Sequence, residues 1–456
     1  MKAKGSMTAA MCLLLLVIMS LLGACIRGTR ISCARVQASN AMDTALYSLF
    51  SQYDQDLLQD YHLFFLDGGY GENKLNLSQI ITQAEAYAGP VLTSGLTKCS
   101  LDACGIDSFQ LASDQKGEAV TEQILRYMKG RLGNKGLQVL TEQLNKNQSI
   151  MENQESIQEG GINEIPLDEA APMEEISESN NPLEIIKNIR SHGFLGLVLP
   201  ENGKISENAL DLQSLLSHRE LEQGLNSLPL SDGASGVADK ILIQEYILEN
   251  LSFYTQENYP GTLDYQVEYV LGGKESDKEN LQYVVNRLLL VREASNIAFL
   301  YTDSQKRSEL QACASALSLL LLIPEGMTLV QGVLAAGWAY VESICDVKTL
   351  LSGGKVPLSK DASSWKTHLN RLSAEDTPSG SKGLDYRDYL FLLLSFSSEE
   401  DLTFRCMDMI EQNIRIKEAR GSFSFDACLY SISVNFLISG PEEKKWQGQR
   451  FYTYKM

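Results

Sequence analysis

The chain opens with an unbroken apolar run that passes directly into an amphipathic pattern. No charged residue occurs between Lys4 and Arg27, and residues 11–26 are mostly Leu, Ile, Val, Met, Gly and Ala. This run is long enough to cross the hydrocarbon core of a bilayer as a helix. No proline precedes Pro90, so the pattern predicts a helix that continues toward Leu66. We therefore expect a membrane anchor at 1–26 and a stalk helix at 27–66. The anchor positions singled out are Met11, Leu14, Val17, Leu21 and Ile26.

Small residues recur along one side of the predicted stalk. Ala34, Ala38, Ala41 and Ala45 follow spacings of four, three and four residues, which places them on one helical face. A face of small residues lets a second helix approach closely. Two interpretations follow: the face packs on the globular part of its own chain, or it meets the stalk of another membrane-anchored subunit.

Beyond Pro90 the pattern predicts an α+β globular part in which helices dominate. Helices are expected at 118–148, 183–190, 277–300, 386–396 and 398–416. Strands are expected at 195–199, 263–270, 425–437 and 450–454. The strand at 263–270 is predicted because apolar and polar residues alternate there. The last two strands would form a small antiparallel sheet.

Two strongly apolar segments, 314–323 and 327–351, are separated by Pro324. The first is too short to span a bilayer. The second contains Glu342 and Asp346, which suit a buried soluble helix. A helical hairpin in the core is the main interpretation, and a second membrane insertion is the alternative.

The charge distribution bears on partners and on domain boundaries. The formal net charge of −19 argues against a nucleic-acid partner, whose phosphates require a basic surface. No Lys or Arg lies between Lys146 and Lys187, while ten acidic residues do. We interpret 147–181 as an acidic disordered linker, with an acidic docking surface for a cationic partner as the alternative. The linker would separate a first globular part, 67–146, from the main domain, 182–456.

Nine cysteines are scattered along the chain. The sequence Leu22-Gly23-Ala24-Cys25 resembles the lipobox of bacterial lipoproteins, in which the cysteine is acylated. A lipid anchor at Cys25 is therefore an alternative to a permanent transmembrane helix. Cys99 and Cys104 are close enough in sequence for a local disulfide in an oxidising compartment. No Cys-x-x-Cys pair exists and no histidine lies near these cysteines, so a zinc site is not expected.

No set of residues predicts catalysis. Both Gly-Gly-Lys fragments, at 272–274 and 353–355, lack the spacing and the following Ser or Thr of a phosphate-binding loop. The four histidines are isolated from one another, and no His-Glu-x-x-His motif occurs. Asp264 and Glu268 share a face of the predicted strand, where solvated carboxylates are the commoner explanation. No catalytic, cofactor-binding or metal-binding residue is predicted.

Several blocks together resemble a known family. The start of the chain and the stretch from Tyr53 to Asp67 look like the beginning of TadE/TadG-like proteins, which are pilin-like proteins of tight-adherence (Tad, or Flp) pili. A closer match is an uncharacterised family of gram-positive membrane proteins, a domain of unknown function related to those pseudopilins. Further matching blocks are Phe194–Pro200, Glu268–Lys274, Trp338–Pro357 and Leu384–Leu390.

The resemblance implies a non-catalytic structural or assembly component of a Tad-like pilus or a related secretion system. It implies a single-pass protein of the cytoplasmic membrane with its globular part outside. Its partners would be the bilayer and other membrane-stalked pilin-like subunits. One feature departs from the pattern: the fifth residue after Gly5 is Ala10, where prepilin peptidase substrates carry Glu. An unprocessed anchor is therefore the expectation.

The charges beside the predicted span do not by themselves fix its orientation. Lys2 and Lys4 precede it, whereas Arg27, Arg30 and Arg35 follow it. The excess on the second side disfavours a cytoplasmic amino terminus. The short tail before the span instead favours a cytoplasmic amino terminus. The expected location of the globular part outside the membrane rests on that orientation.

Overall fold

The computed structural model of the protein describes most of the chain, as two compact units. Unit 1 consists of Met1–Gln123, Glu220–Asp232 and Lys417–Met456, and unit 2 of Ile124–Arg219 and Gly233–Ile416. The fold is helix-dominated α+β, as predicted. The described residues are 4–94, 97–161, 181–191, 194–199, 205–226, 236–256, 261–321, 326–369, 372 and 382–454.

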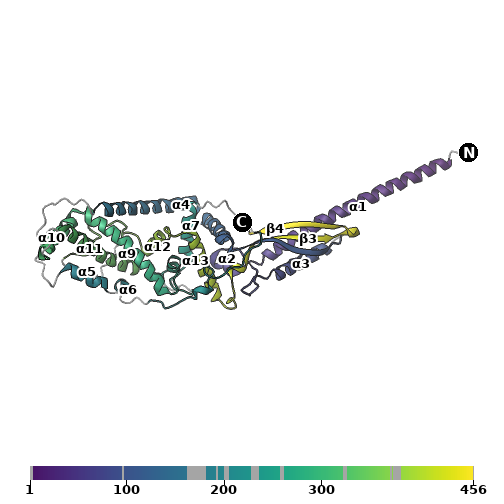
Figure 1. The fold of residues 1–456 in the computed structure, drawn as a ribbon. Helices are drawn as coiled ribbons and strands as arrows, with labels where there is room; N and C mark the ends of the chain where they lie inside the picture. The colour runs from purple at the N-terminus through teal and green to yellow at the C-terminus, as the bar shows by residue number, and fades with distance from the viewer. Residues whose placement is uncertain are drawn as a thin grey trace. The chain divides into compact units, whose positions relative to one another are not determined.

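Unit 1 combines three helices with a small antiparallel sheet (Figure 1). Its helices are α1 (Lys4–Phe50), α2 (Gln55–Tyr61) and α3 (Leu77–Thr93). Its strands are β1 (Leu66–Asp67), β2 (Ser100–Leu111), β3 (Cys428–Ser439) and β4 (Lys445–Thr453). The short 3₁₀ turns η4 (Phe425–Ala427) and η5 (Pro441–Glu443) flank β3. Helix α4 (Asp114–Gly161) begins in this unit and continues into unit 2.

Strand β3 is the centre of the sheet. It pairs antiparallel with β2, with β4 and with the two-residue strand β1. Phe436 is opposite Cys104 of β2 and opposite Gly448 of β4. The predicted strands near the carboxyl end are therefore β3 and β4, and their antiparallel pairing is confirmed.

The predicted stalk helix is interrupted. Helix α1 ends at Phe50, and a new helix, α2, begins after Asp54, whose carboxylate accepts a hydrogen bond from the Leu57 N–H at 3.0 Å. Such a cap satisfies an amide that has no partner within the helix. His62 then ends α2 in a left-handed conformation, with φ of 59°. The chain between 51 and 66 therefore folds against the sheet instead of extending the stalk.

Unit 2 is almost entirely helical. Its shorter helices are α5 (Pro182–Ser191), α6 (Phe194–Val198), α7 (Val237–Asn250), α8 (Gln266–Gly272) and α12 (Tyr386–Leu394). Its longer helices are α9 (Asp277–Thr302), α10 (Ser304–Leu320), α11 (Met327–Leu351) and α13 (Glu399–Arg415), and η2 (Leu212–Ser214) is a 3₁₀ turn. Trp338 lies in the core formed by α9, α10 and α11, with no exposed surface.

The apolar segments after residue 313 form the expected helical pair. Helices α10 and α11 pack together in the core of unit 2, and most of α11 is buried there. This burial corrects the alternative of a second membrane insertion. Within the described ranges, α1 is the one helix long and apolar enough to cross a membrane.

Two of the predicted strands are helices instead. Residues 195–199 fall mainly in α6, and 263–270 run into α8. The prediction of a strand at 263–270 treated its polar residues as solvent-facing. In the structure Gln266 and Glu268 are both fully buried, and each hydrogen-bonds inside the unit. Alternation along the sequence therefore does not reflect alternating exposure here.

Two further expectations concern Cys99 and the acidic segment. Cys99 immediately precedes β2 and Cys104 lies within it, and both are free thiols. A strand rises about 3.3 Å per residue, so five residues separate their Cα atoms by roughly 16 Å, too far for a disulfide. Helix α4 extends to Gly161, into the segment for which disorder is predicted. Residues 162–180 of that segment lie outside the described residues.

Candidate functional site

The predicted anchor residues all lie on the amino-terminal half of α1. The side chains of Met11, Leu14, Val17, Leu21 and Ile26 are each 60–66% exposed. Among its described residues, unit 1 buries none of the window of α1 that is apolar enough to span a membrane. Figure 1 shows this half of α1 extending beyond the sheet. A bilayer is the environment in which such a helix satisfies both its side chains and its backbone.

The alanine face is buried inside unit 1. Ala34, Ala38, Ala41 and Ala45 are at most 3% exposed and belong to a cluster with Ala88 and Leu92 of α3. Gln37 reinforces this contact by donating from Nε2 to the Val91 carbonyl at 2.8 Å. The face therefore packs on its own chain, and the alternative in which it meets another stalk is corrected by this burial.

Cys25 lies within α1, not at its end. The helix continues for 25 residues beyond it, and its thiol is exposed. Thr29 donates a hydrogen bond to the Cys25 carbonyl at 2.9 Å, so the helical turn around the cysteine is closed. The structure therefore places the possible lipidation residue in a continuous helix.

Unit 2 contains a buried charge cluster. Its four charged side chains, from Arg292, Asp346, Lys360 and Glu342, have no exposed surface. Arg292 on α9 donates to Asp346 Oδ2 from Nη2 at 3.0 Å and from Nε at 3.1 Å. Lys360 donates to Glu342 Oε1 at 2.5 Å and to Asp346 Oδ1 at 2.8 Å. Two cations thus balance two carboxylates on one side of α11.

The cluster fixes the segment that follows α11. Arg292 Nη1 donates to the carbonyls of Pro357 and Leu358, while Glu342 accepts the backbone N–H groups of Lys366 and Thr367. Burial alone would raise the pKa of Asp346, but Arg292 and Lys360 hold it below its usual value. Because the carboxylates, the cations and the loop amides satisfy one another, the arrangement is suited to holding a loop in place.

Asp264 precedes α8, whereas Glu268 lies within it. Asp264 is exposed, whereas Glu268 is fully buried. Glu268 Oε1 accepts from the Tyr254 N–H at 2.9 Å and from the Tyr386 hydroxyl at 2.8 Å. Burial raises the pKa of Glu268 to about 7. The two carboxylates therefore do not form the paired site that a shared strand face would give.

One group in unit 2 has the residue types of a hydrolase triad but not its geometry. Ser217 Oγ donates to Asp408 Oδ2 at 2.5 Å and lies 2.8 Å from His218 Nδ1. Tyr269 also donates to Asp408 Oδ2, at 2.9 Å. In a triad the histidine bridges serine and aspartate. Here the serine bridges them, so its proton is directed toward the carboxylate and the group links the 217–218 segment to α13.

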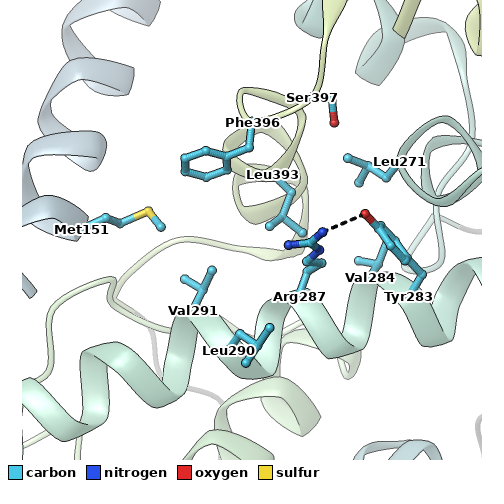
Figure 2. A pocket seen from close by; sticks show the side chains of 10 residues that line it. All are labelled: Met151, Leu271, Tyr283, Val284, Arg287, Leu290, Val291, Leu393, Phe396 and Ser397. Atoms are coloured by element: carbon cyan, nitrogen blue, oxygen red, sulfur yellow. Dashed lines mark hydrogen bonds between the residues drawn. The ribbon is translucent and has the colours of Figure 1, made fainter. Parts of the chain in front are cut away.

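A pocket of about 270 Å³ opens in unit 2 between α9 and the end of α12 (Figure 2). Seven of its ten lining residues are apolar, and Arg287 is the one charged residue among the ten. The lining residues are Met151, Leu271, Tyr283, Val284, Arg287, Leu290, Val291, Leu393, Phe396 and Ser397. Sequence reasoning did not identify this pocket, because its residues come from α4, α8, α9, α12 and the α12–α13 connection.

The charge cluster was not predicted from the sequence either, although the sequence contains an indication of it. Glu342 and Asp346 lie one helical turn apart in a segment that is otherwise apolar. Two acids on one face of a buried helix require cations or hydrogen-bond donors nearby.

Within the described part of the chain, no group of three or more His, Cys, Asp or Glu side chains is arranged to hold a metal ion.

Comparison with known proteins places most of unit 2 in a family. The model of a "Family of unknown function (DUF5702)" matches residues 172–440. No curated protein and no solved structure matches the chain.

Proposed function

This chain belongs to the family of unknown function DUF5702, and we propose that it is a membrane-anchored, non-catalytic structural or assembly component of a Tad-like pilus or related secretion system. The observation that carries the proposal is the division of α1 into two halves. One half is apolar and exposed, and the other packs through its alanines on α3 beside an antiparallel sheet. A helix of this kind can remain in a membrane while its own globular unit holds its other half.

Because the alanine face is occupied, contacts with other membrane-stalked subunits use a different side of α1. Val36 and Tyr47 lie on that helix with 60% and 65% of their side chains exposed. The apolar amino-terminal half of α1, which precedes these two residues, is available for contact within the bilayer. Large apolar side chains exposed beside a membrane segment are suited to packing against a second anchored helix.

The location of the globular units is tested by protease shaving of intact, wall-stripped cells that carry a tag after Met456. Loss of the tag is the expected result, because the proposal places residues 27–456 outside the cytoplasmic membrane. A cytoplasmic protein of known location serves as the protection control. A protected tag would place both units in the cytoplasm and would rule out an external assembly role.

The partner is tested with a photocrosslinking amino acid at Tyr47, compared with one at Val237 of unit 2, which is equally exposed. A crosslink from position 47 to another single-span pilin-like protein, without the same product from position 237, is expected. No crosslink to such a protein from position 47 would contradict the proposed contact surface. The mass of the mature protein distinguishes the proposed transmembrane anchor from the alternative, a surface lipoprotein that acts as a binding module. Processing to an acylated Cys25 would remove residues 1–24 and add the mass of the acyl chains.

A further inference from the structure

The pocket in unit 2 combines seven apolar lining residues with one cation, Arg287, for which the described part of the chain supplies no acidic partner. Arg287 donates from Nη2 to the Tyr283 hydroxyl at 3.3 Å, and its guanidinium carbon lies 5.4 Å from the centre of that ring. In the described residues, no carboxylate pairs with Arg287. Figure 2 shows the guanidinium between Tyr283 and the Leu393 and Val291 side chains. The pocket therefore offers one positive charge at the edge of an apolar space.

The rim of the same pocket exposes large apolar side chains. Leu290 and Phe396 are 61% and 60% exposed, so each leaves most of its side chain in water. The sulfur-containing side chain of Met151 faces them from α4 (Figure 2). Methionine is flexible and adapts to occupants of different shape. An occupant that covered Leu290 and Phe396 would gain hydrophobic free energy from surface that is exposed at present.

The small number of polar side chains in the lining favours an alkyl chain over a peptide as the occupant of the pocket. Besides Arg287, the side chains that supply polar groups are those of Tyr283 and Ser397. An extended peptide brings an N–H and a C=O at every residue, and each loses free energy when buried without a partner. An alkyl chain has no such groups. Its single anionic head can accept charge-assisted hydrogen bonds from a guanidinium.

We propose that this pocket binds a single-chain alkyl carboxylate, with its head on Arg287 and its chain against Val291, Leu393 and Phe396. The pocket volume of about 270 Å³ is close to the lower limit of common small-molecule sites, roughly 300 Å³. It therefore suits a short or medium chain, not a two-chain lipid. The source is the membrane to which α1 anchors the protein. This site is independent of the proposed assembly role.

The test uses the full-length chain in nanodiscs of zwitterionic lipid, with a ten-carbon carboxylic acid that carries a photoreactive diazirine on its chain. The expected result is labelling of the peptides that contain Val291 or Leu393. Arg287→Gln should reduce that labelling at least tenfold, and Arg287→Lys should retain part of it. Arg307→Gln, on α10 outside the pocket, is the matched control and should leave labelling unchanged. Thermal unfolding of each variant shows whether the fold is kept.

Four results would overturn the proposal. The first is equal labelling of the wild type and of a folded Arg287→Gln variant. The second is labelling confined to the apolar half of α1. The third is equal labelling of the pocket by the matching ten-carbon alcohol, which lacks the anionic head. The fourth is the absence of any labelling in the pocket; capture of a protein in cells by a photocrosslinker at position 396 would then identify the occupant as a polypeptide.

Discussion

Arg292 on α9 donates two hydrogen bonds, of 3.0 and 3.1 Å, to the same carboxylate oxygen of Asp346 on α11, and neither side chain is exposed. The other oxygen of Asp346 accepts from Lys360. A buried ion pair of this kind costs much desolvation free energy, so its members depend on one another. Removing one of them leaves an uncompensated charge in the core.

Asp346→Asn should therefore destabilise unit 2 by about 3–5 kcal/mol, the range observed when one partner of a buried ion pair is removed. Unfolding of the full-length protein by denaturant measures the change. Lys355→Gln is the control, because the Lys355–Asp385 pair is long, at 3.7 Å, and partly exposed. That substitution should cost under about 1 kcal/mol. Similar losses for the two variants would contradict the role of the cluster.

Glu268 should make stability depend on pH. Its pKa is about 7 in the fold, against 4.5 for an unperturbed side chain, because burial disfavours the carboxylate. The folded chain thus keeps a proton that the unfolded chain loses, so stability falls as the pH rises from about 4.5 to 7. At 1.36 kcal/mol per pKa unit the loss from this group is about 3 kcal/mol.

Glu268→Gln removes this titration while keeping an oxygen for the Tyr386 hydroxyl. The variant should be more stable than the wild type at pH 8 and should show a weaker decline between pH 5 and 7. Denaturation midpoints across this range provide the measurement. An unchanged slope in the variant would show that Glu268 does not titrate in the folded protein.

The alanine face should tolerate no large side chain. Ala38→Leu or Ala41→Leu places added atoms into the contact with α3, where overpacking typically costs 1–3 kcal/mol. We expect a lower melting temperature for unit 1 and increased protease sensitivity. Val36→Leu, on the exposed side of α1, should leave the melting temperature unchanged. Bulky substitutions at Ala38 that leave unit 1 stable would indicate a free face instead.

Cys99 and Cys104 should not form a disulfide with each other, even in an oxidising compartment. Burial raises the pKa of Cys104 to about 11 and also raises that of Cys99, so little thiolate is present near neutral pH. Mass spectrometry of the non-reduced protein should therefore show no peptide joined by a 99–104 bridge. Alkylation at pH 8 should be slow in the fold and fast in denaturant. A recovered 99–104 bridge would contradict the strand geometry.

The elements that were predicted correctly have local signals in the sequence. Helix α1 was expected from its uncharged apolar start and β3 from its alternation, and the helices expected at 183–190 and 277–300 correspond to α5 and α9. Where the stalk was expected to continue to Leu66, the cap at Asp54 starts a new helix. Its carboxylate is fixed by Arg420, which lies far along the chain.

The misassigned and missed elements depend on tertiary contacts. The polar residues of α8 are buried because partners from α12, α13 and neighbouring loops satisfy them, which no local pattern shows. Strand β2 was not predicted, and its pairing with β3 shifts register at three places. Such irregularities weaken a period-two pattern. The pocket and the charge cluster likewise arise only when distant segments meet around α9 and α11.

The construction of unit 1 from both ends of the chain has a consequence for its synthesis. Its first helix leaves the ribosome long before β3, which supplies the sheet beside α1. At about 5–20 residues per second, the roughly 380 residues between them take on the order of 20–80 s to translate. During that interval α1 can enter the membrane, but its anchor-proximal sheet does not yet exist. A ribosome that stalls within unit 2 would therefore leave an inserted anchor without its partner strand, as a substrate for quality-control proteases.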